Sequence, residues 1–355
     1  MTQSTLSEVK DAVTPRATLL VIGVLALQLL FIASYVGALH DPELKDVPFG
    51  VAAPPAVADQ AVARLERLPG SPLDPRAAGD RAAARQQILD RDIDAALVVD
   101  PAGTKDTLLV ATGGGRTLAL ALDTLVTTLE KSQGRTVRTV DVAPASSRDF
   151  NALSSFYLVI GWCVGGYLCA SILAISAGAR PANPTRGAIR LGTMALVSIV
   201  GGLGGAVIVG PVLGALPGGV VALWWLGALV TFAVGAATLA LQGLVGVIGI
   251  GLAILLVVIA GNPSAGGALP PPMLPPFWHA IGPFLPPGAG TWSARSIAYF
   301  DSNDMTGSLL VLGAWALAGV VITLAVAVVR QRRTAHPDDP AGTGAGGTPR
   351  TGGAR

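Results

Sequence analysis

The chain alternates between long uncharged apolar stretches and one segment of mixed polarity. The first apolar stretch, residues 17–39, follows Pro15 and Arg16 and contains no charged residue. At about 1.5 Å per residue it can cross a hydrocarbon core of about 30 Å as a helix. A cleaved signal peptide shares the basic start, but this run is too long for one and no small-residue cleavage site follows it. We therefore expect a membrane anchor helix.

Five further apolar segments follow a polar insertion. No Asp, Glu, Lys or Arg occurs between Arg190 and Arg295, and a water-facing fold could not lack charge over such a length. No charge marks the turn between the fourth and fifth spans, which we place at 241–243. The expected spans after the first cover residues 153–176, 191–212, 220–241, 243–260 and 308–329.

Two details of these spans concern packing. Small residues four apart within 161–165 and 201–205 let helices approach closely, which we interpret as packing within one bundle rather than as a dimer interface. Cys163 and Cys169 are six positions apart, so they do not share a helix face. The sequence therefore predicts neither a disulfide framework nor a metal site.

Residues 40–150 alternate strand and helix patterns and predict a compact α/β domain. The helical segments carry apolar residues three and four positions apart, whereas the strands are short and bounded by Gly, Pro or Asp. About 110 residues can bury a small core. The expected strands are PFGVAA, AALVVD, TLLVA and TVRTVDVA, and the expected helices are AVADQAVARLERL, DRAAARQQILDRDI and RTLALALDTLVTTLEKS.

Composition then predicts a membrane protein, and the distribution of charge predicts its orientation in the membrane. The chain is 51% hydrophobic and 13% charged, with a mean hydropathy of +0.60, which is typical of a membrane protein. Basic residues occur before the first span, between the second and third, and after the sixth: Lys10, Arg16, Arg180, Arg186, Arg190, Arg330, Arg332 and Arg333.

With six spans these three clusters fall on one side, which the positive-inside rule makes the cytoplasm. The expected fold is an α-helical polytopic membrane protein of six transmembrane helices with an inserted extracytoplasmic α/β domain. We expect a multi-pass protein of the cell (inner or plasma) membrane with both termini cytoplasmic. Its parts are an N-tail (1–16), helix 1 (17–39), the domain (40–150), a five-helix bundle (151–330) and a disordered tail (331–355).

The connection at 261–305 is apolar, aromatic and interrupted by Pro, unlike an exposed loop. Irregular backbone at membrane depth requires cover by protein or a water-filled cavity. We therefore expect short broken helices around 276–282 and 291–300 that dip into the outer leaflet, either as an outer gate or as an interfacial aromatic belt that includes Tyr299. The candidate substrate-path residues are Phe277, Trp278, His279, Trp292 and Arg295.

Arg295 has two expected uses. Its guanidinium can reach the membrane surface as an anchor, or it can bind an anionic headgroup in a fork geometry.

The order of one anchor helix, an outer α/β domain and a five-span bundle resembles the type 2 ABC-transporter permeases. DAALVVDPAG (94–103) and LPPFWHAIGPFLPPGAGTWSARSIAYFD (274–301) are most similar to the branch that includes the bacterial phage infection proteins. The Pro-bounded short helix, the following Pro and the Arg of that family map onto 275–282, 286–287 and Arg295. The resemblance implies a pair of bundles, hence a homodimer, above a cytoplasmic ATPase.

The loop at 178–190, with Arg180, Arg186 and Arg190, is the candidate contact for that ATPase; alternatively it only sets the topology. The chain itself has no GxxxxGK[ST] loop, and TGGGR at 112–116 lacks the Lys of a phosphate cradle. The three His are scattered and no nucleophile motif occurs. We expect no enzymatic activity, no catalytic residue, no cofactor, no metal and no nucleic-acid partner.

Two functions remain. A secondary transporter would need ionisable groups inside the bundle, and the spans lack them. The first hypothesis is a permease-like subunit that exports a hydrophobic or amphipathic substrate, lipid-like or small, powered by a separate ATPase. The second is a non-transporting cell-envelope protein whose outer domain binds a partner. Membrane lipids surround the chain in both.

Overall fold

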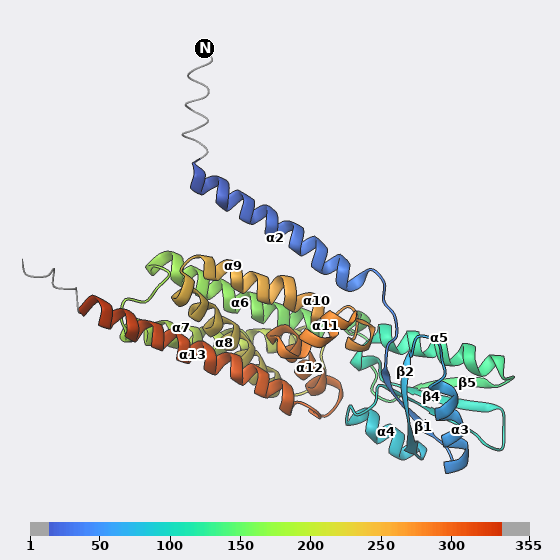
Figure 1. Cartoon of the computed structure of the whole chain (residues 1–355). Coiled ribbons are helices and arrows are strands. Elements are labelled where there is room, and N and C mark those ends of the chain that lie inside the picture. Colours follow the sequence, from blue (N-terminus) through green and yellow to red (C-terminus); the bar gives the residue numbers. More distant parts are fainter. Residues whose placement is uncertain (1–13, 336–355) are drawn as a thin grey trace, which may run out of the picture.

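The structure, a computed structural model, describes residues 14–335 (Figure 1). Residues 1–13 and 336–355, which make up most of the two predicted tails (1–16 and 331–355), lie outside the described residues. Within the described part, five helices are long and apolar enough to cross a membrane, which makes this a multi-pass membrane protein. They cover Ala17–Leu39, Ser154–Ala177, Pro184–Val212, Val220–Val245 and Thr306–Arg332.

A sixth, shorter apolar helix, Ile248–Ser264, lies between α8 (Val220–Val245) and the aromatic connection. It consists of α9 (Ile248–Ile254), the π-helical η4 (Leu255–Gly261) and α10 (Asn262–Ser264). The predicted division at 241–243 is wrong, since α8 continues to Val245. The turn comes at Gly246, where φ is +70°, a conformation that glycine adopts at no steric cost.

Four helices form the centre of the bundle, namely α6 (Ser154–Ala177), α7 (Pro184–Val207), α8 and α13 (Thr306–Ala335). A π-helical turn, η3 (Ile208–Val212), extends α7 around Pro211, which has no N–H for a regular helix. Because α13 continues to Ala335, the first residues of the predicted disordered tail are helical. Figure 1 shows that α2 (Pro15–Leu39) approaches the bundle only near its C-terminal end, where Ser34 and Ala38 are buried.

Glycines bring these helices together, but of the four that the four-residue spacing indicates only Gly205 is among them, since an added Cβ there would lie 2.5 Å from Trp162 Nε1. A Cβ on Gly166 would lie 2.7 Å from Thr231 O, and one on Gly202 would lie 2.6 Å from Ala228 N. Gly161, Gly165 and Gly201 would meet nothing within 4 Å. The interpretation of these three as packing positions is therefore wrong.

The α/β domain contains a mixed five-stranded sheet in the order β2-β1-β3-β4-β5, in which only β3 and β4 are antiparallel. The strands are β1 (Val47–Ala52), β2 (Leu73–Gly79), β3 (Ala95–Val98), β4 (Lys105–Val110) and β5 (Thr136–Asp141). The helices are α3 (Pro55–Leu65), α4 (Arg81–Leu89) and α5 (Arg116–Ser132).

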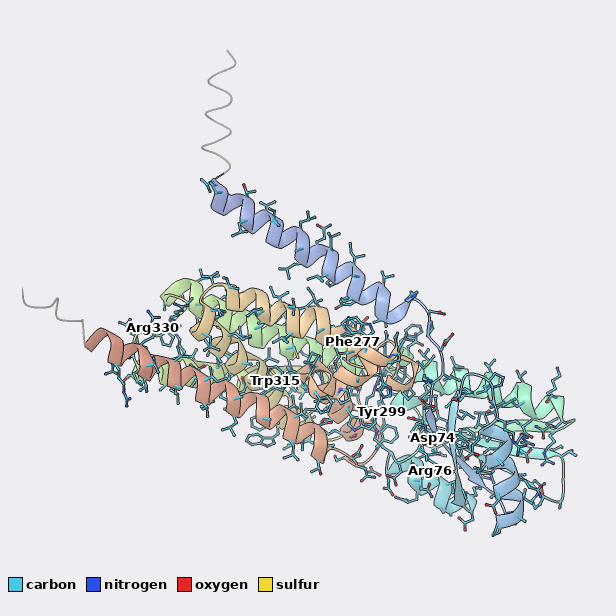
Figure 2. All side chains as sticks on the ribbon, viewed as in Figure 1. Asp74, Arg76, Phe277, Tyr299, Trp315 and Arg330 are labelled. Atoms are coloured by element: carbon cyan, nitrogen blue, oxygen red, sulfur yellow. The ribbon has the colours of Figure 1, made fainter. Side chains whose placement is uncertain are left out.

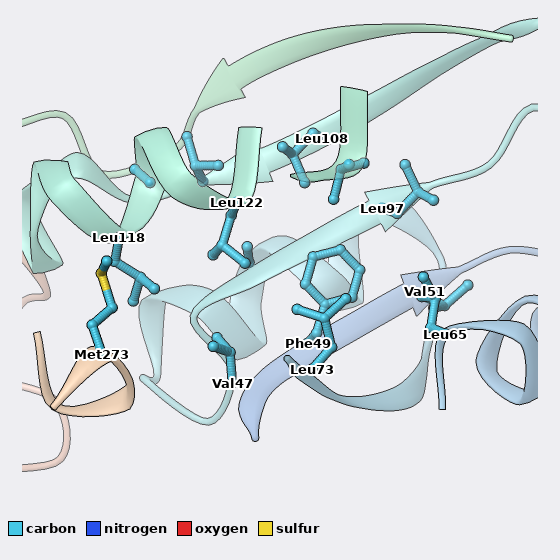
Figure 3. Packing of buried hydrophobic residues seen from close by; sticks show 14 of the residues in the cluster. Val47, Phe49, Val51, Leu65, Leu73, Leu97, Leu108, Leu118, Leu122 and Met273 are labelled. Carbon is cyan, nitrogen blue, oxygen red and sulfur yellow. The ribbon is translucent and has the colours of Figure 1, made fainter. Parts of the chain in front are cut away.

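The sheet packs α3 and α5 on one face and α4 on the other. Figure 3 shows Phe49, Leu97 and Leu122 in the first of these cores. Met273, from the aromatic connection between the last two apolar helices, enters the same core beside Leu118 (Figure 3). Leu269 and Leu274 join it as well, so the connection fastens the bundle to the domain.

The aromatic connection contains η5 (Pro271–Met273), α11 (Pro276–Ile281), η6 (Gly282–Phe284) and α12 (Pro286–Tyr299). Both short helices were predicted, but α12 begins at Pro286 rather than near residue 291. Two prolines occupy its first positions, where a missing N–H costs nothing. Nearly all of α12 is buried among α6, α8 and α13, with Gly290 against Val159 and Val230.

Candidate functional site: the cleft between the domain and the bundle

Arg91 joins the α/β domain to α12. It follows α4 with a left-handed φ of +65°, and its guanidinium lies 3.3 Å from the centroid of the Trp292 ring. Its Nη1 donates to Trp292 O at 3.0 Å and to Ser296 Oγ at 2.7 Å. Stacking on an aromatic face together with directed hydrogen bonds is a geometry that lysine cannot reproduce.

Other contacts hold the same junction. Asn303 Nδ2 donates to Leu89 O at 3.1 Å and to Asp90 Oδ1 at 3.0 Å. Tyr299 OH donates to Asp149 Oδ2 at 2.5 Å, and Figure 2 shows Tyr299 where the bundle meets the domain. The domain and the bundle are therefore joined by specific polar contacts as well as by the linker.

The TGGGR segment belongs to this junction too. A Cβ on Gly113 would lie 2.5 Å from Tyr299 Cγ, and one on Gly115 would lie 2.4 Å from Pro270 Cγ. These glycines allow the domain to approach the bundle closely, so a phosphate would find no room against them.

A cleft of about 550 Å³ opens beside the junction. Its volume is within the range of about 300–1,000 Å³ that is typical of small-molecule sites. Its apolar lining residues include Pro48, Pro270, Pro271, Pro272, Pro283, Phe284, Ala289 and Val311. The ionisable or polar lining residues are Asp46, Arg91, Asp94, Ser264, His279, Arg295, Asp304 and Ser308. Such a lining suits a molecule with both apolar and polar parts.

The charges in the cleft are desolvated and coupled. Burial, reinforced by Arg295, lowers the pKa of Arg91 to about 9, while Asp94 and Asp304 oppose the change. Burial raises the pKa of Asp94 to about 6, against the opposing attraction of Arg91. At pH 7 both groups are therefore mainly charged, and Asp94 is the one that titrates in the physiological range.

The structure places Arg295 inside the protein, not at the membrane surface. Its side chain is 2% exposed. Nη1 donates to Gly266 O at 2.7 Å and Nη2 to Gly267 O at 3.1 Å, beyond the last turn of α10. These carbonyls belong to the buried loop after α10, where the guanidinium supplies the donors that buried backbone oxygens require. The interpretation of Arg295 as an interfacial anchor is wrong.

The aromatic candidates divide into two groups. Trp292 and Tyr299 are committed to the junction, since Trp292 Nε1 also donates to Asp304 O at 2.8 Å, so they do not form an exposed belt. Phe277 and His279 are exposed. Trp278 is partly buried against the domain core and meets the Phe277 ring edge-on.

The loop between α6 and α7 covers only residues 178–183, so Arg180 lies in it while Arg186 and Arg190 belong to α7. Arg180 and Arg190 hold helix ends. Arg190 Nη2 donates to Ala177 O at 2.8 Å and to Gly178 O at 2.7 Å, at the end of α6. Arg180 Nη2 donates to Leu244 O at 3.0 Å, at the end of α8. Arg180 and Arg186 are both exposed, and Arg186 lies on the first turn of α7.

The sequence predicted Trp292 and Arg295, which lie in one segment, as candidate site residues. It did not predict Arg91 and Asp94. The pattern DRDID around them carries several charges, and nothing local distinguishes the two that face the cleft. Within residues 14–335, no group of three His, Cys, Asp or Glu side chains could hold a metal ion, and both cysteines are free thiols.

Comparisons with protein-family models, with curated proteins and with solved structures find no match to this chain. The resemblance to the type 2 ABC-transporter permeases therefore stays a prediction.

Proposed function

We propose that this chain is a permease-like membrane subunit that exports a hydrophobic or amphipathic molecule, with a separate cytoplasmic ATPase as its source of energy. The observation that supports the proposal best is the cleft between domain and bundle, whose lining combines five prolines with Arg91 and Asp94. An apolar body and a polar head would each find matching surface there.

The position of the cleft also favours transport over simple anchoring. Its lining comes from the α/β domain, from the aromatic connection and from the first turns of α13, so a shift of the domain relative to the bundle changes its shape. A protein that used its spans only as an anchor would need one helix. Here α12 packs inside the bundle, close to the cleft.

The proposed topology has six spans, with Ile248–Ser264 as the fifth. The seven residues of α9, the seven of η4 and the three of α10 together extend about 26 Å as a regular helix. This length is slightly less than the thickness of the hydrocarbon core. Arg180 and Arg330 lie at the end of the bundle away from the domain, where Figure 2 shows Arg330. The positive-inside rule makes that end cytoplasmic and the domain extracytoplasmic.

A second candidate is a non-transporting envelope protein whose outer domain binds a partner. The use of buried Arg190 as a helix cap favours it, because this side chain is then not available to an ATPase. Under the permease proposal, Arg186 is the cation of the loop that contacts the ATPase, beneath a pair of bundles.

Two measurements test the proposal. Purification from native membranes in mild detergent should recover a P-loop ATPase with this chain, and a preparation free of any ATPase would refute the proposed energy source. In cells, the chain with its ATPase should lower the accumulation of amphipathic dyes such as Nile red and ethidium.

A variant with a large side chain in the cleft, compared with a matched variant outside it, tests whether the cleft is needed for the effect on dye accumulation. Gly307 lines the cleft and Gly313 does not, although both lie on α13 and neither would meet an atom within 4 Å of an added Cβ. Gly307→Trp should abolish the effect on dye accumulation and Gly313→Trp should preserve it. Equal behaviour of the two variants would remove the cleft from the transport path.

A further inference from the structure

A groove of about 480 Å³ lies between α6 and α7, on the side of the bundle. It shares no lining residue with the cleft beside the domain. Tyr157, Ile208 and Leu213 line it and are each more than half exposed. In a membrane such a surface faces lipid, so the molecules that can enter the groove come from the bilayer.

Glycines make the groove hollow. Gly161 and Gly165 on α6 and Gly201 on α7 line it, and an added Cβ on any of them would meet nothing within 4 Å. Trp162, whose Nε1 donates to Gly201 O at 3.2 Å, also lines the groove and is almost fully buried. Among the residues that the structure describes, no charged side chain lines the groove.

One polar group in this apolar groove has no partner. Thr231 of α8 lines the groove and is 2% exposed, yet its Oγ1 makes no hydrogen bond. Serine and threonine hydroxyls inside helices commonly donate to the carbonyl four residues earlier, as Thr238 does to Val234 O at 2.7 Å. A buried hydroxyl left without a partner destabilises the protein, and a ligand oxygen would remove that cost.

We propose that this groove binds an elongated apolar molecule from the bilayer that carries an acceptor oxygen within its hydrophobic body, and that Thr231 donates a hydrogen bond to that oxygen. The inference does not depend on transport, because the groove is separate from the cleft.

The shape of the groove argues against a second copy of the chain as its occupant. A symmetric dimer places the same patch of both subunits face to face, and two hollows that face each other leave a void. Close helix contact requires that the small residues of one helix meet a ridge of the other. A flexible chain from the bilayer can follow the hollow, so it is the occupant that the geometry favours.

The test uses two photoreactive alkyl-diazirine chains of equal length, one with a mid-chain ketone and one with a methylene in its place, added to the full-length protein in phosphatidylcholine nanodiscs. The ketone chain should label α6 and α7 about threefold to tenfold more strongly than the methylene chain, as one hydrogen bond provides. Thr231→Val, which keeps the shape and removes the hydroxyl, should abolish the difference. If both chains label the wild type equally, the role of Thr231 is refuted.

Variants that fill the groove test its occupancy. Gly161→Leu and Gly165→Leu should each abolish labelling by both chains, and thermal stability should stay at the wild-type value because neither site is crowded. The control is Gly204→Leu, on the same helix as Gly201 and equally uncrowded but outside the groove. Unchanged labelling in the two filled variants would overturn the proposal. So would a detergent-solubilised dimer that Gly161→Leu dissociates while labelling persists, since a second copy would then occupy the groove.

Discussion

Arg91→Ala should loosen the α/β domain from the bundle without unfolding either. The substitution removes two hydrogen bonds from a charged donor, each contributing about 1.5–3 kcal/mol, and a cation–π contact of about 1 kcal/mol. Release of the ordered side chain returns up to about 2 kcal/mol of conformational entropy. The docked state should therefore lose roughly 2–5 kcal/mol. Alanine and arginine both carry a Cβ at φ +65°, so the difference reports the side chain and not the backbone.

Hydrogen exchange followed by mass spectrometry measures this loss directly. The amide of Lys45 donates to Pro272 O at 3.1 Å, so its exchange reports contact between the domain and the aromatic connection. Exchange there should accelerate by about 30-fold or more, since every 1.4 kcal/mol corresponds to a factor of ten. The amides of β1 and β3 should keep their protection. Arg85→Ala, an exposed arginine of α4, is the control. Equal exchange at Lys45 in the two variants would refute the role of Arg91.

Three further predictions concern charge. Arg135→Ala should destabilise the α/β domain by about 3–5 kcal/mol in urea unfolding, because Arg135 holds buried Asp106 with two contacts of 2.6 Å; a loss below 1 kcal/mol would contradict this reading. The raised pKa of Asp94 favours the protonated form in the folded protein, so its stabilising effect is present near pH 4 and is lost as the pH rises through about 6. Asp94→Asn should therefore raise the melting temperature at pH 7.5 but not at pH 4, and an unchanged melting temperature at pH 7.5 would be evidence against the shift. Arg186→Glu should weaken binding of the proposed ATPase at unchanged melting temperature, whereas Arg190→Glu should lower the melting temperature; the reverse pattern would contradict the capping role.

The sequence predicted the helices and strands that a pattern of neighbouring residues specifies. The charge-free runs located the membrane helices, and apolar spacing located α3, α4 and α5. It missed β2, because LDPRAAG carries no alternating apolar pattern and includes Pro75. That segment is a strand because it lies parallel to β1 at the edge of the sheet, where a proline is tolerated. The turn after α8 was misplaced because several glycines near it look alike, and only Gly246 takes a positive φ among 242–247.

The candidate site was harder to predict because its contacts are long-range. Arg91 and the Trp292 carbonyl are 201 positions apart in the chain. Arg295 is the first charge after a long neutral stretch, which suggested a side chain that reaches lipid headgroups. Its acceptors are instead the carbonyls of Gly266 and Gly267, in the loop after α10. No local pattern in the sequence predicts that a distant side chain will donate to them.

Three arginines that donate to backbone carbonyls indicate which polar groups remain for a ligand. Arg190 and Arg180 donate at the ends of α6 and α8, and Arg295 donates to loop carbonyls after α10, a task that suits a guanidinium because it offers five donors and keeps its charge. The acceptors of Arg295 are buried and cannot turn to water, so they need a donor from the protein. A cation next to an apolar span therefore does not by itself indicate a ligand site, because its side chain can be used to satisfy backbone carbonyls. Among the described residues that line the two sites, the carboxyl of Asp94 in the cleft and the unpartnered hydroxyl of Thr231 in the groove do not serve such carbonyls. A ligand of either site should be sought through those two side chains, and not through the arginines that are conspicuous in the sequence.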